Sequence, residues 1–425
     1  MLFKINRINM PVLLAINILL GQNTFDEYKQ QRKDAFITYK DSVQLKYSEF
    51  TKKEKEQLEQ FKKEIELKWQ LYKGSSKKTY VSYAEDLDSR ASVYFDEGYI
   101  ELEVIIEEHS DDNGSLNYFH NIIRDSFLAF NYNEKSLAIT SSFFARNLTL
   151  YEMQKRNSKA NITVGPFLKA SKKLFRRFIE LISEKAEDGI EILKNQISDS
   201  SGKIIDTKAS AKTFFDGIMK KKVKKGKPYT GKDGKTWALY SVKIPLQENH
   251  KLARMERYKN EIKYQSKRFD IDYPIAMAIT ETESSFNPKA TSHIPAYGLM
   301  QLVPSTGARD AYAYVYKKDK FVGKNYLYNP KNNIELGCAY IAKIRHDYLK
   351  NIDNDIKAYM CTIAAYNTGV GNLSKALTKQ PKLSPTVKKV KSLSSPELYT
   401  KLMEELEYKE ARQYLKKVWS RKEKY

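Results

Sequence analysis

The chain has 425 residues, of which 74 are Lys or Arg and 52 are Asp or Glu, so its formal net charge is +22 at pH 7. Hydrophobic residues make up 41% and aromatic residues 12%, enough to build buried cores, which excludes a wholly disordered chain. Beyond the N-terminus no run approaches the roughly 20 apolar residues of a membrane-spanning helix, which excludes a polytopic membrane protein.

The charge and the few metal-ligating residues narrow the functional classes. A strongly basic chain indicates an anionic partner, and the charge alone leaves nucleic acid, a membrane surface and an acidic polymer open. The two cysteines cannot form a disulfide framework or a CxxC metal site, and the five histidines lack HxxxH and HExxH spacing. We therefore expect neither a zinc enzyme nor another metal site.

Residues 1–21 have the pattern of a targeting segment. Lys4 and Arg7 precede an apolar run from Met10 to Leu20, and polar sequence follows Gly21. A buried N-terminal helix is the alternative. We predict export, with residues 1–21 acting as a signal peptide or as an apolar anchor.

A long charged helix is predicted for residues 24–72 and ends before Gly74-Ser75-Ser76. Its apolar residues recur at spacings of three and four and form one stripe: Leu58, Phe61, Ile65, Trp69 and Tyr72. A hairpin follows, in which strands 92–95 and 99–106 flank Asp96-Glu97-Gly98. In its second strand apolar residues alternate with glutamates: Ile100, Leu102, Val104 and Ile106 against Glu101, Glu103 and Glu107. This alternation predicts an antiparallel sheet with one solvent-exposed face.

The next part of the chain returns to helix and then to strand. Residues 115–200 are expected to be mostly helical, with an amphipathic stretch at 164–197. A basic run at 220–227 precedes a second hairpin around Asp233-Gly234, whose strand ends at Pro245. Helical sequence begins near residue 248. We therefore expect an N-terminal α+β domain at 22–247 and a helical domain at 248–425.

One carboxyl group in the helical region has an unusual setting. Asp272 and Pro274 are typical of a helix start, and Asn287-Pro288 ends the helix. Glu283 shares a face with apolar residues, whereas Glu281 lies about 200° away around the helix. Desolvation and the helix dipole both disfavour the charged form of Glu283, so this residue can act as a general acid. An ordinary solvated glutamate at a helix end is the alternative.

Four ordered blocks surround this glutamate: Glu283-Ser-Ser-Phe-Asn-Pro288, Gly298-Leu-Met-Gln301, Asn329-Pro330 with Asn333-Ile334, and Ala365-Tyr-Asn-Thr-Gly369. Over residues 250–425 the chain resembles the soluble lytic transglycosylase family, which is related to goose-type lysozyme. Residues before 248 resemble the N-terminal domain of the membrane-bound lytic murein transglycosylase C family. The resemblance implies an α+β protein: an N-terminal mixed helix and antiparallel-sheet domain, followed by an all-α lysozyme-like catalytic domain.

The resemblance also implies a reaction that needs no cofactor. Such enzymes cleave the β-1,4 bond between N-acetylmuramic acid and N-acetylglucosamine without water and leave a 1,6-anhydromuramic end. Glu283 would act as acid and then as base, and the substrate's N-acetyl oxygen would replace the second carboxylate of most glycosidases. Asp310, Asp319 and Glu335 are then expected to be structural.

The family pattern assigns further residues around Glu283. Ser292 and Gln301 would hydrogen-bond the acetamido group, Tyr366 would orient the acid or the substrate, and Asn367 would brace its turn. Met300, with Leu299, would form the cleft wall, and Gly298 would let the backbone approach the substrate. Tyr340 either lines the cleft or packs in the core.

Peptidoglycan glycan strands are the partner that the resemblance implies, in the periplasm. Relatives carry a lipid-modified Cys after a Leu-Leu-Gly-like run, but Gln22 follows Gly21 here, so a membrane association would use the apolar segment. Cys338 and Cys361 can pair or remain buried thiols. A non-catalytic wall-binding or scaffolding protein is the alternative function. No nucleic-acid binding is expected, because only the 220–227 run suggests it and no nucleic-acid motif accompanies it.

Overall fold

The computed structural model describes residues 25–108, 166–293 and 295–425. The predicted targeting segment at 1–21 and residues 115–165 of the predicted helical stretch lie outside the described residues. The chain divides into two compact units, Met1–Gln60 and Phe61–Tyr425. Within the described ranges, no helix combines the length and the hydropathy that crossing a membrane would require.

Helix α2 (Phe25–Lys68) confirms the predicted long charged helix. In the first unit its described side chains are mainly exposed, and Leu58 in the predicted apolar stripe is 49% exposed. In the second unit Ile65 and Trp69 are buried. The helix ends at Lys68, four residues earlier than expected at Tyr72, and the Trp69 indole donates to Leu87 O at 2.6 Å.

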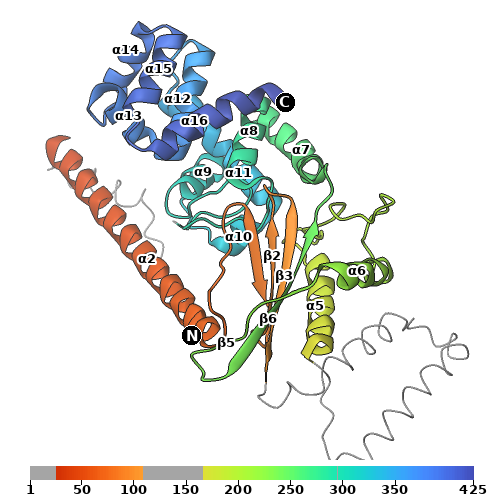
Figure 1. Cartoon of the computed structure of the whole chain (residues 1–425). Coiled ribbons are helices and arrows are strands. Elements are labelled where there is room, and N and C mark those ends of the chain that lie inside the picture. The colour runs from red at the N-terminus through yellow and green to blue at the C-terminus, as the bar shows by residue number, and fades with distance from the viewer. Residues whose placement is uncertain (1–24, 109–165, 294) are drawn as a thin grey trace, which may run out of the picture. The chain divides into compact units, whose positions relative to one another are not determined.

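An antiparallel sheet forms the N-terminal part of the second unit (Figure 1). Its strands are β1 (Thr79–Tyr83), β2 (Ser89–Tyr94), β3 (Tyr99–Glu107), β4 (Lys224–Lys225), β5 (Tyr229–Thr230) and β6 (Thr236–Pro245). The order is β1-β2-β3-β6-β4, with β5 also paired to β6. Both predicted hairpin turns are present, and Gly98 and Gly234 have φ of +73° and +78°.

Both faces of the sheet are covered, so the predicted solvent-exposed face is wrong. Helices α5 (Pro166–Ile182) and α6 (Lys208–Lys222) pack on the face that carries Ile100, Leu102 and Val104. On the other face Ile105 packs with Trp69 and Trp237.

Glu103 on that second face is buried because its charge is matched. The Arg90 guanidinium binds it through two hydrogen bonds of 2.7 and 3.0 Å, and the Lys73 ammonium lies 2.8 Å away. A buried carboxylate is tolerated where such partners surround it.

The predicted amphipathic helix ends at Ile182 rather than near residue 197. The chain then makes two short antiparallel bridges, Lys185 with Glu191 and Ser198 with Ile204. Gly189 and Gly202 have positive φ within them. The dipeptides Asp188-Gly189 and Ser201-Gly202 are turn signals, and they override the apolar periodicity.

The C-terminal part is helical, which confirms the α+β class. Its helices are α7 (His250–Arg268), α8 (Tyr273–Ser284), α9 (Gly307–Tyr316), α10 (Lys324–Tyr328), α11 (Pro330–Ala342), α12 (Asp355–Thr368), α13 (Val370–Thr378), α14 (Leu383–Ser392), α15 (Ser395–Glu405) and α16 (Lys409–Arg421). A π-helical segment (Lys343–Tyr348) follows α11. Helix α8 packs against α7 and α16, and α16 also packs against α12.

Candidate active site

Helix α8 begins as its sequence predicts, but it ends at Ser284, before the stop that Asn287-Pro288 predicts. The Asp272 carboxylate accepts a hydrogen bond from the Ile275 amide at 2.9 Å, and Pro274 stands in the first turn, where its missing N–H costs nothing. Ser285 and Phe286 follow with φ of +51° and +60°, a rare conformation for residues with a Cβ. Phe286 is fully buried, and its packing offsets the cost of this turn.

Glu283 lies in the last turn of α8, with its side chain 5% exposed. Burial raises its pKa above the usual range, and the nearby Glu410 charge adds to the rise. The Lys77 ammonium and the Tyr414 hydroxyl act in the opposite direction. The alternative of an ordinary solvated glutamate is therefore wrong, because Glu283 is a buried carboxyl group that favours its protonated form.

Lys77 reaches this carboxyl from the N-terminal part of the chain. Its ammonium lies 3.3 Å from Glu283 Oε2 and 3.9 Å from Glu410 Oε1. Lys77 stands two residues before β1, and 206 positions of sequence separate it from Glu283. Sequence reasoning missed this contact, and no local pattern around Lys77 indicates it.

Two tyrosines complete the surroundings of Glu283. Tyr366 on α12 donates its hydroxyl to Met300 O at 2.8 Å, and Tyr414 comes from α16. Burial and the Glu283 charge raise the pKa of both phenols well above the usual value, so both remain protonated. The Tyr414 hydroxyl interacts with Glu283 without reaching ordinary hydrogen-bond geometry. The sequence motifs around Glu283 do not point to Tyr414.

One asparagine makes three hydrogen bonds that help to hold the loop after α8. Asn333 on α11 accepts from the Met300 amide at 2.7 Å and donates to the carbonyls of Tyr297 and Leu327, both at 2.8 Å. A Cβ on Gly298 would lie 2.3 Å from Leu327 O and from the Asn333 amide. The protein's own backbone therefore requires a glycine here, whatever the substrate requires.

Gln301 has an unusual hydrogen-bond pattern. It is buried at φ +49°, and its amide nitrogen donates to Ala290 O and Gly298 O, both at 3.0 Å. Its Oε1 is buried and has no hydrogen-bond partner among the described residues. A buried acceptor without a partner is costly, and it suits a ligand that brings an N–H group.

The other predicted site residues occupy different settings. Ser292 is partly exposed, and its Oγ accepts from the Ala296 amide at 3.2 Å. Met300 has no exposed surface and packs against Gly337, so its side chain lies in the core and not on a cleft wall. Tyr340 is partly buried on α11, with its ring centroid 5.3 Å from that of Tyr366. Asn367 is partly buried in the last turn of α12.

The three other acids that were expected to be structural are each paired with a cation. Asp310 lies 3.3 Å from the Lys343 ammonium, Glu335 lies 2.6 Å from the Arg268 guanidinium, and Asp319 pairs with Arg309, in agreement with structural roles. Among the described residues no cluster of His, Cys, Asp and Glu could hold a metal ion.

Glu281, two residues before Glu283, is also buried, which sequence reasoning missed. It accepts from the Tyr425 hydroxyl at 3.0 Å, and the Arg421 guanidinium lies 3.6 Å away. Cys338 and Cys361 are buried free thiols, so the alternative of a disulfide is wrong.

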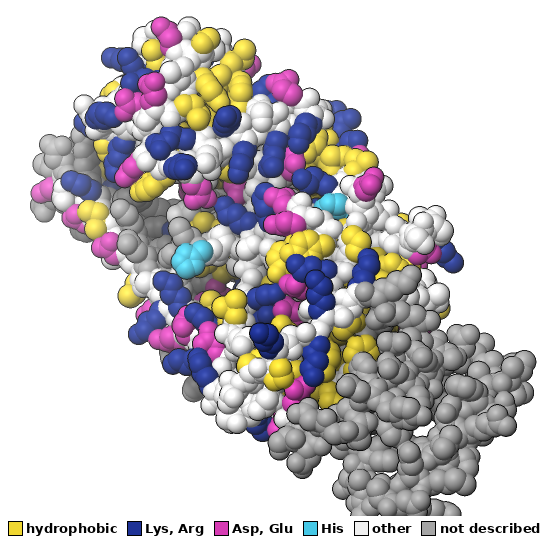
Figure 2. All heavy atoms as spheres, in the orientation of Figure 1, with side chains coloured by type: hydrophobic (Ala, Val, Ile, Leu, Met, Phe, Trp, Pro, Cys, Tyr) yellow, Lys and Arg dark blue, Asp and Glu magenta, His cyan; other side chains and the backbone are white. Residues whose placement is uncertain are grey.

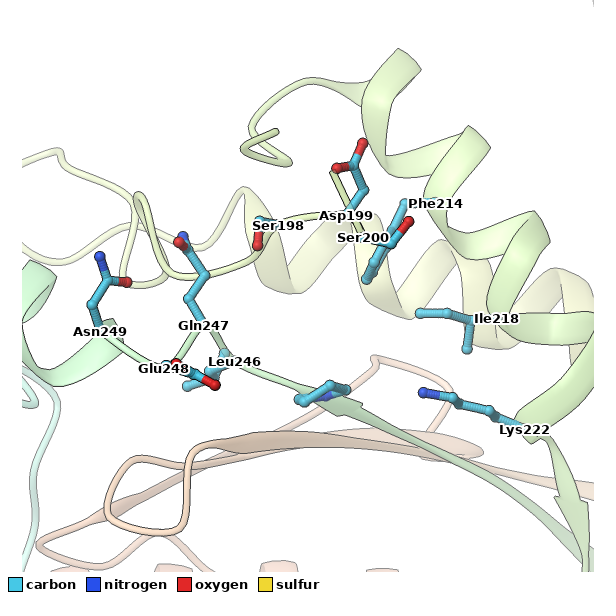
Figure 3. A pocket seen from close by; sticks show the side chains of 11 residues that line it. Ser198, Asp199, Ser200, Phe214, Ile218, Lys222, Leu246, Gln247, Glu248 and Asn249 are labelled. Atoms are coloured by element: carbon cyan, nitrogen blue, oxygen red, sulfur yellow. The ribbon is translucent and has the colours of Figure 1, made fainter. Parts of the chain in front are cut away.

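A cavity of about 710 Å³ lies away from these residues (Figure 3). The turn Ser198–Ser200, residues of α6 and the segment after β6 line it, and Lys222 and Glu248 are among the polar side chains that do so. None of the residues around Glu283 contributes to its lining. We therefore assign the candidate site to the Glu283 group, because the buried acid and the partnerless Gln301 acceptor lie there.

Two protein families match the chain. The family described as "Transglycosylase SLT domain" matches residues 260–387, and "Membrane-bound lytic murein transglycosylase C, N-terminal domain" matches residues 38–129. A membrane-bound lytic murein transglycosylase C from Klebsiella pneumoniae is 30% identical over 56% of this chain and 65% of its own length. One from Glaesserella parasuis is 32% identical over 55% of this chain and 62% of its own length. The chain thus covers less than two thirds of these relatives.

Solved structures of lytic transglycosylases are also similar in part. An inactive mutant of lytic transglycosylase Slt from Pseudomonas aeruginosa has 25% sequence identity and a TM-score of 0.30, covering 39% of this chain and 23% of that chain. The 70 kDa soluble lytic transglycosylase from Escherichia coli has 24% identity and a TM-score of 0.29, with the same coverage. The resemblance inferred from the sequence motifs is confirmed: residues 260–387 match the transglycosylase SLT domain, and the chain is similar to the membrane-bound lytic murein transglycosylases C.

Proposed function

We propose that this protein is a peptidoglycan lytic transglycosylase, which cleaves the bond between N-acetylmuramic acid and N-acetylglucosamine and leaves a 1,6-anhydromuramic end. The observation that carries the proposal is the buried Glu283 carboxyl, whose pKa is raised by desolvation. A general acid works best when its pKa lies near the working pH, and burial moves a carboxyl in that direction.

In the proposed reaction a single carboxyl carries out two proton transfers, giving up one proton and then taking another. Glu283 gives its proton to the glycosidic oxygen as the bond to the anomeric carbon breaks. The resulting carboxylate then takes the proton of the sugar's C6 hydroxyl, whose oxygen closes the anhydro ring. The substrate's N-acetyl oxygen supports the positive anomeric carbon between these steps, in place of a protein carboxylate.

In a hydrolytic mechanism with two carboxylates, Glu410 would be the candidate for the second one. Its charge influences Glu283, but its side chain is 78% exposed and pairs with Lys77 at 3.9 Å. We therefore propose that Glu283 works without it.

The substrate's acetamido group fits the free acceptor of Gln301. We infer that Gln301 Oε1 accepts the acetamido N–H and that Ser292 contributes its hydroxyl at the same subsite. Tyr366 would hold the loop through Met300 O, while Tyr340 and Asn367 border the site. Met300 would then act through its backbone.

The location and the charge fit this substrate. We propose that the protein is exported and works in the periplasm, in association with a membrane through its N-terminal segment. On the face shown in Figure 2, Lys and Arg side chains are spread over the surface with Asp and Glu between them, without a continuous basic stripe. Such a surface would favour capture of a polymer whose stem peptides and lactyl groups carry carboxylates.

The test is digestion of purified sacculi, with the released muropeptides identified by mass spectrometry. We expect anhydro-ended products from the wild-type chain and none from Glu283→Gln, while Glu410→Gln and the remote control Glu335→Gln remain active. Products with reducing ends would show a hydrolase. Binding of sacculi without any release by the wild-type chain would support the non-catalytic alternative.

A further inference from the structure

The segment just before β1 is fixed against the loop that follows the candidate acid. The Thr291 amide donates to Ser76 O at 3.3 Å, and the Asn287 side-chain amide donates to Lys77 O at 3.5 Å. Asn287 is fully buried and stands four residues after Glu283. The backbone of Lys77 is therefore held in place by the same turn that ends α8.

A second set of contacts holds the β2–β3 turn at the same place. The Ser285 hydroxyl donates to the Asp96 carboxylate, and Lys78 pairs with that carboxylate. The buried Arg254 guanidinium donates to Ser285 O and to Phe95 O, both at 2.9 Å. The sheet is thus attached to the end of α8 on both sides of the Lys77 segment, so the position of Lys77 depends on the fold and not on its side chain alone.

The Lys77 side chain contacts Glu283 from the more exposed side. It is 34% exposed, whereas the Glu283 side chain is 5% exposed. The other titratable groups that face Glu283 are Tyr414 and Glu410 from α16 and Tyr366 from α12. Because both phenols remain protonated and Glu410 is an anion, Lys77 is the cation in this group.

We propose that Lys77 is a positioning residue of the active site, which stabilises the Glu283 carboxylate during the interval between its two proton transfers. This inference rests on the proposed function. After Glu283 has protonated the glycosidic oxygen, it carries a negative charge in a buried setting, and the Lys77 ammonium donates a charge-assisted hydrogen bond to it. Once the C6 hydroxyl has returned a proton to Glu283, the contact weakens. Lys77 exchanges no proton itself, and the N-terminal sheet region supplies part of the catalytic site.

The pH dependence of turnover tests this role. Without the ammonium, the Glu283 carboxylate forms less readily, so its pKa rises and Glu283 becomes a weaker acid. An opposite charge at this distance typically shifts a carboxyl pKa by about one unit or more. For Lys77→Met we expect turnover about tenfold lower and a falling limb about one unit higher in pH. Lys77→Arg should restore both, and Lys77→Gln repeats the test if the Met variant does not fold.

Lys78→Met is the matched control, because Lys78 is the next residue and pairs with Asp96 instead of Glu283. It is expected to leave the position of the falling limb unchanged. An infrared titration of the Glu283 carboxyl, taken as the difference from Glu283→Gln, measures the same shift without substrate. Superimposable profiles and titrations for wild type and Lys77→Met would overturn the inference. Faster turnover of Lys77→Met at every pH would also overturn it, because the ammonium would then obstruct the site. An inactive wild-type chain would refute the proposed function alone, since the infrared titration would still decide the role of Lys77.

Discussion

Asn333 provides the sharpest test of how the active-site loop is held. Its buried side chain makes three hydrogen bonds to backbone groups of the 297–300 loop and α10. Replacing it with alanine removes all three at once and leaves the surrounding backbone in place. Asn333 lies inside α11, where alanine is a good helix former, so the helix itself should not be weakened. The substitution therefore tests the lost hydrogen bonds.

The expected loss of stability can be estimated group by group. The Met300 amide would lose its hydrogen-bond acceptor while buried, which costs about 1–3 kcal/mol. Tyr297 O would keep its hydrogen bond from the Leu302 amide at 3.2 Å, so this carbonyl would lose one ordinary hydrogen bond, worth about 1 kcal/mol. We count the lost hydrogen bond to Leu327 O at about 1 kcal/mol as well. Asn333→Ala should therefore lower the free energy of unfolding by about 3–5 kcal/mol.

Urea unfolding gives this difference, and hydrogen exchange locates it. The Met300 amide should exchange much faster in Asn333→Ala, together with the rest of the 297–302 loop. Asn332→Ala is the control, since its partly buried side-chain amide makes only a long bond of 3.4 Å to Tyr326 O. The reasoning would be refuted if Asn333→Ala cost less than about 1 kcal/mol, or if the two variants were equally destabilised.

Four further measurements test other parts of the structure. Gly298→Ala should destabilise the chain by at least about 2 kcal/mol, because φ is +77° and the new Cβ would lie 2.3 Å from a carbonyl oxygen; wild-type urea stability would contradict this. Glu103→Gln should lower the free energy of unfolding by about 3 kcal/mol, because the buried Arg90 charge is left with an uncharged partner. Unchanged thermal unfolding of this variant would exclude such a pairing energy. Burial raises the pKa of Glu103, but Arg90 and Lys73 lower it by more, so its folded-state pKa lies below the usual value. The stability that Glu103 contributes is therefore complete above the unfolded pKa of about 4.3 and is lost as the pH falls through the lower folded pKa. Acid unfolding of Glu103→Gln should lack this component. Retention on sacculi should weaken with added salt, and salt-independent retention would argue against capture by charge.

Local chemistry made much of the fold predictable. The start of α8 follows from Asp272 and Pro274, and both hairpins follow from turn residues that flank alternating strands. Glu283 could be placed on an apolar face because helical spacing decides that within a few residues. The helix does not reach residue 197, because the Asp188-Gly189 turn outweighs the apolar periodicity of this stretch.

Contacts between distant segments could not be predicted. In the alternating pattern the Glu103 side of the sheet looks solvent-exposed, and only the tertiary structure brings Trp69 and Lys73 over it. Lys77 is one of many lysines, and its role depends on a contact across 206 positions. Gly298 could be recognised as special, but its true neighbour, Leu327 O, is supplied by another helix.

The buried guanidinium of Arg254 has a consequence for how this protein can change over evolution. Its hydrogen-bond acceptors are two backbone carbonyls, the Gln196 side chain and the His250 ring, contributed by separate stretches of sequence, and none is a carboxylate. Burial and the adjacent positive charges lower the pKa of His250 to about 4, which keeps that ring neutral and able to accept. If recombination exchanged the sheet region alone, the new region would have to supply the same hydrogen-bond acceptors. Otherwise the buried Arg254 guanidinium would lose some of them. We therefore expect the sheet region and the transglycosylase domain to be inherited as a pair, with compensating changes on both sides of their junction.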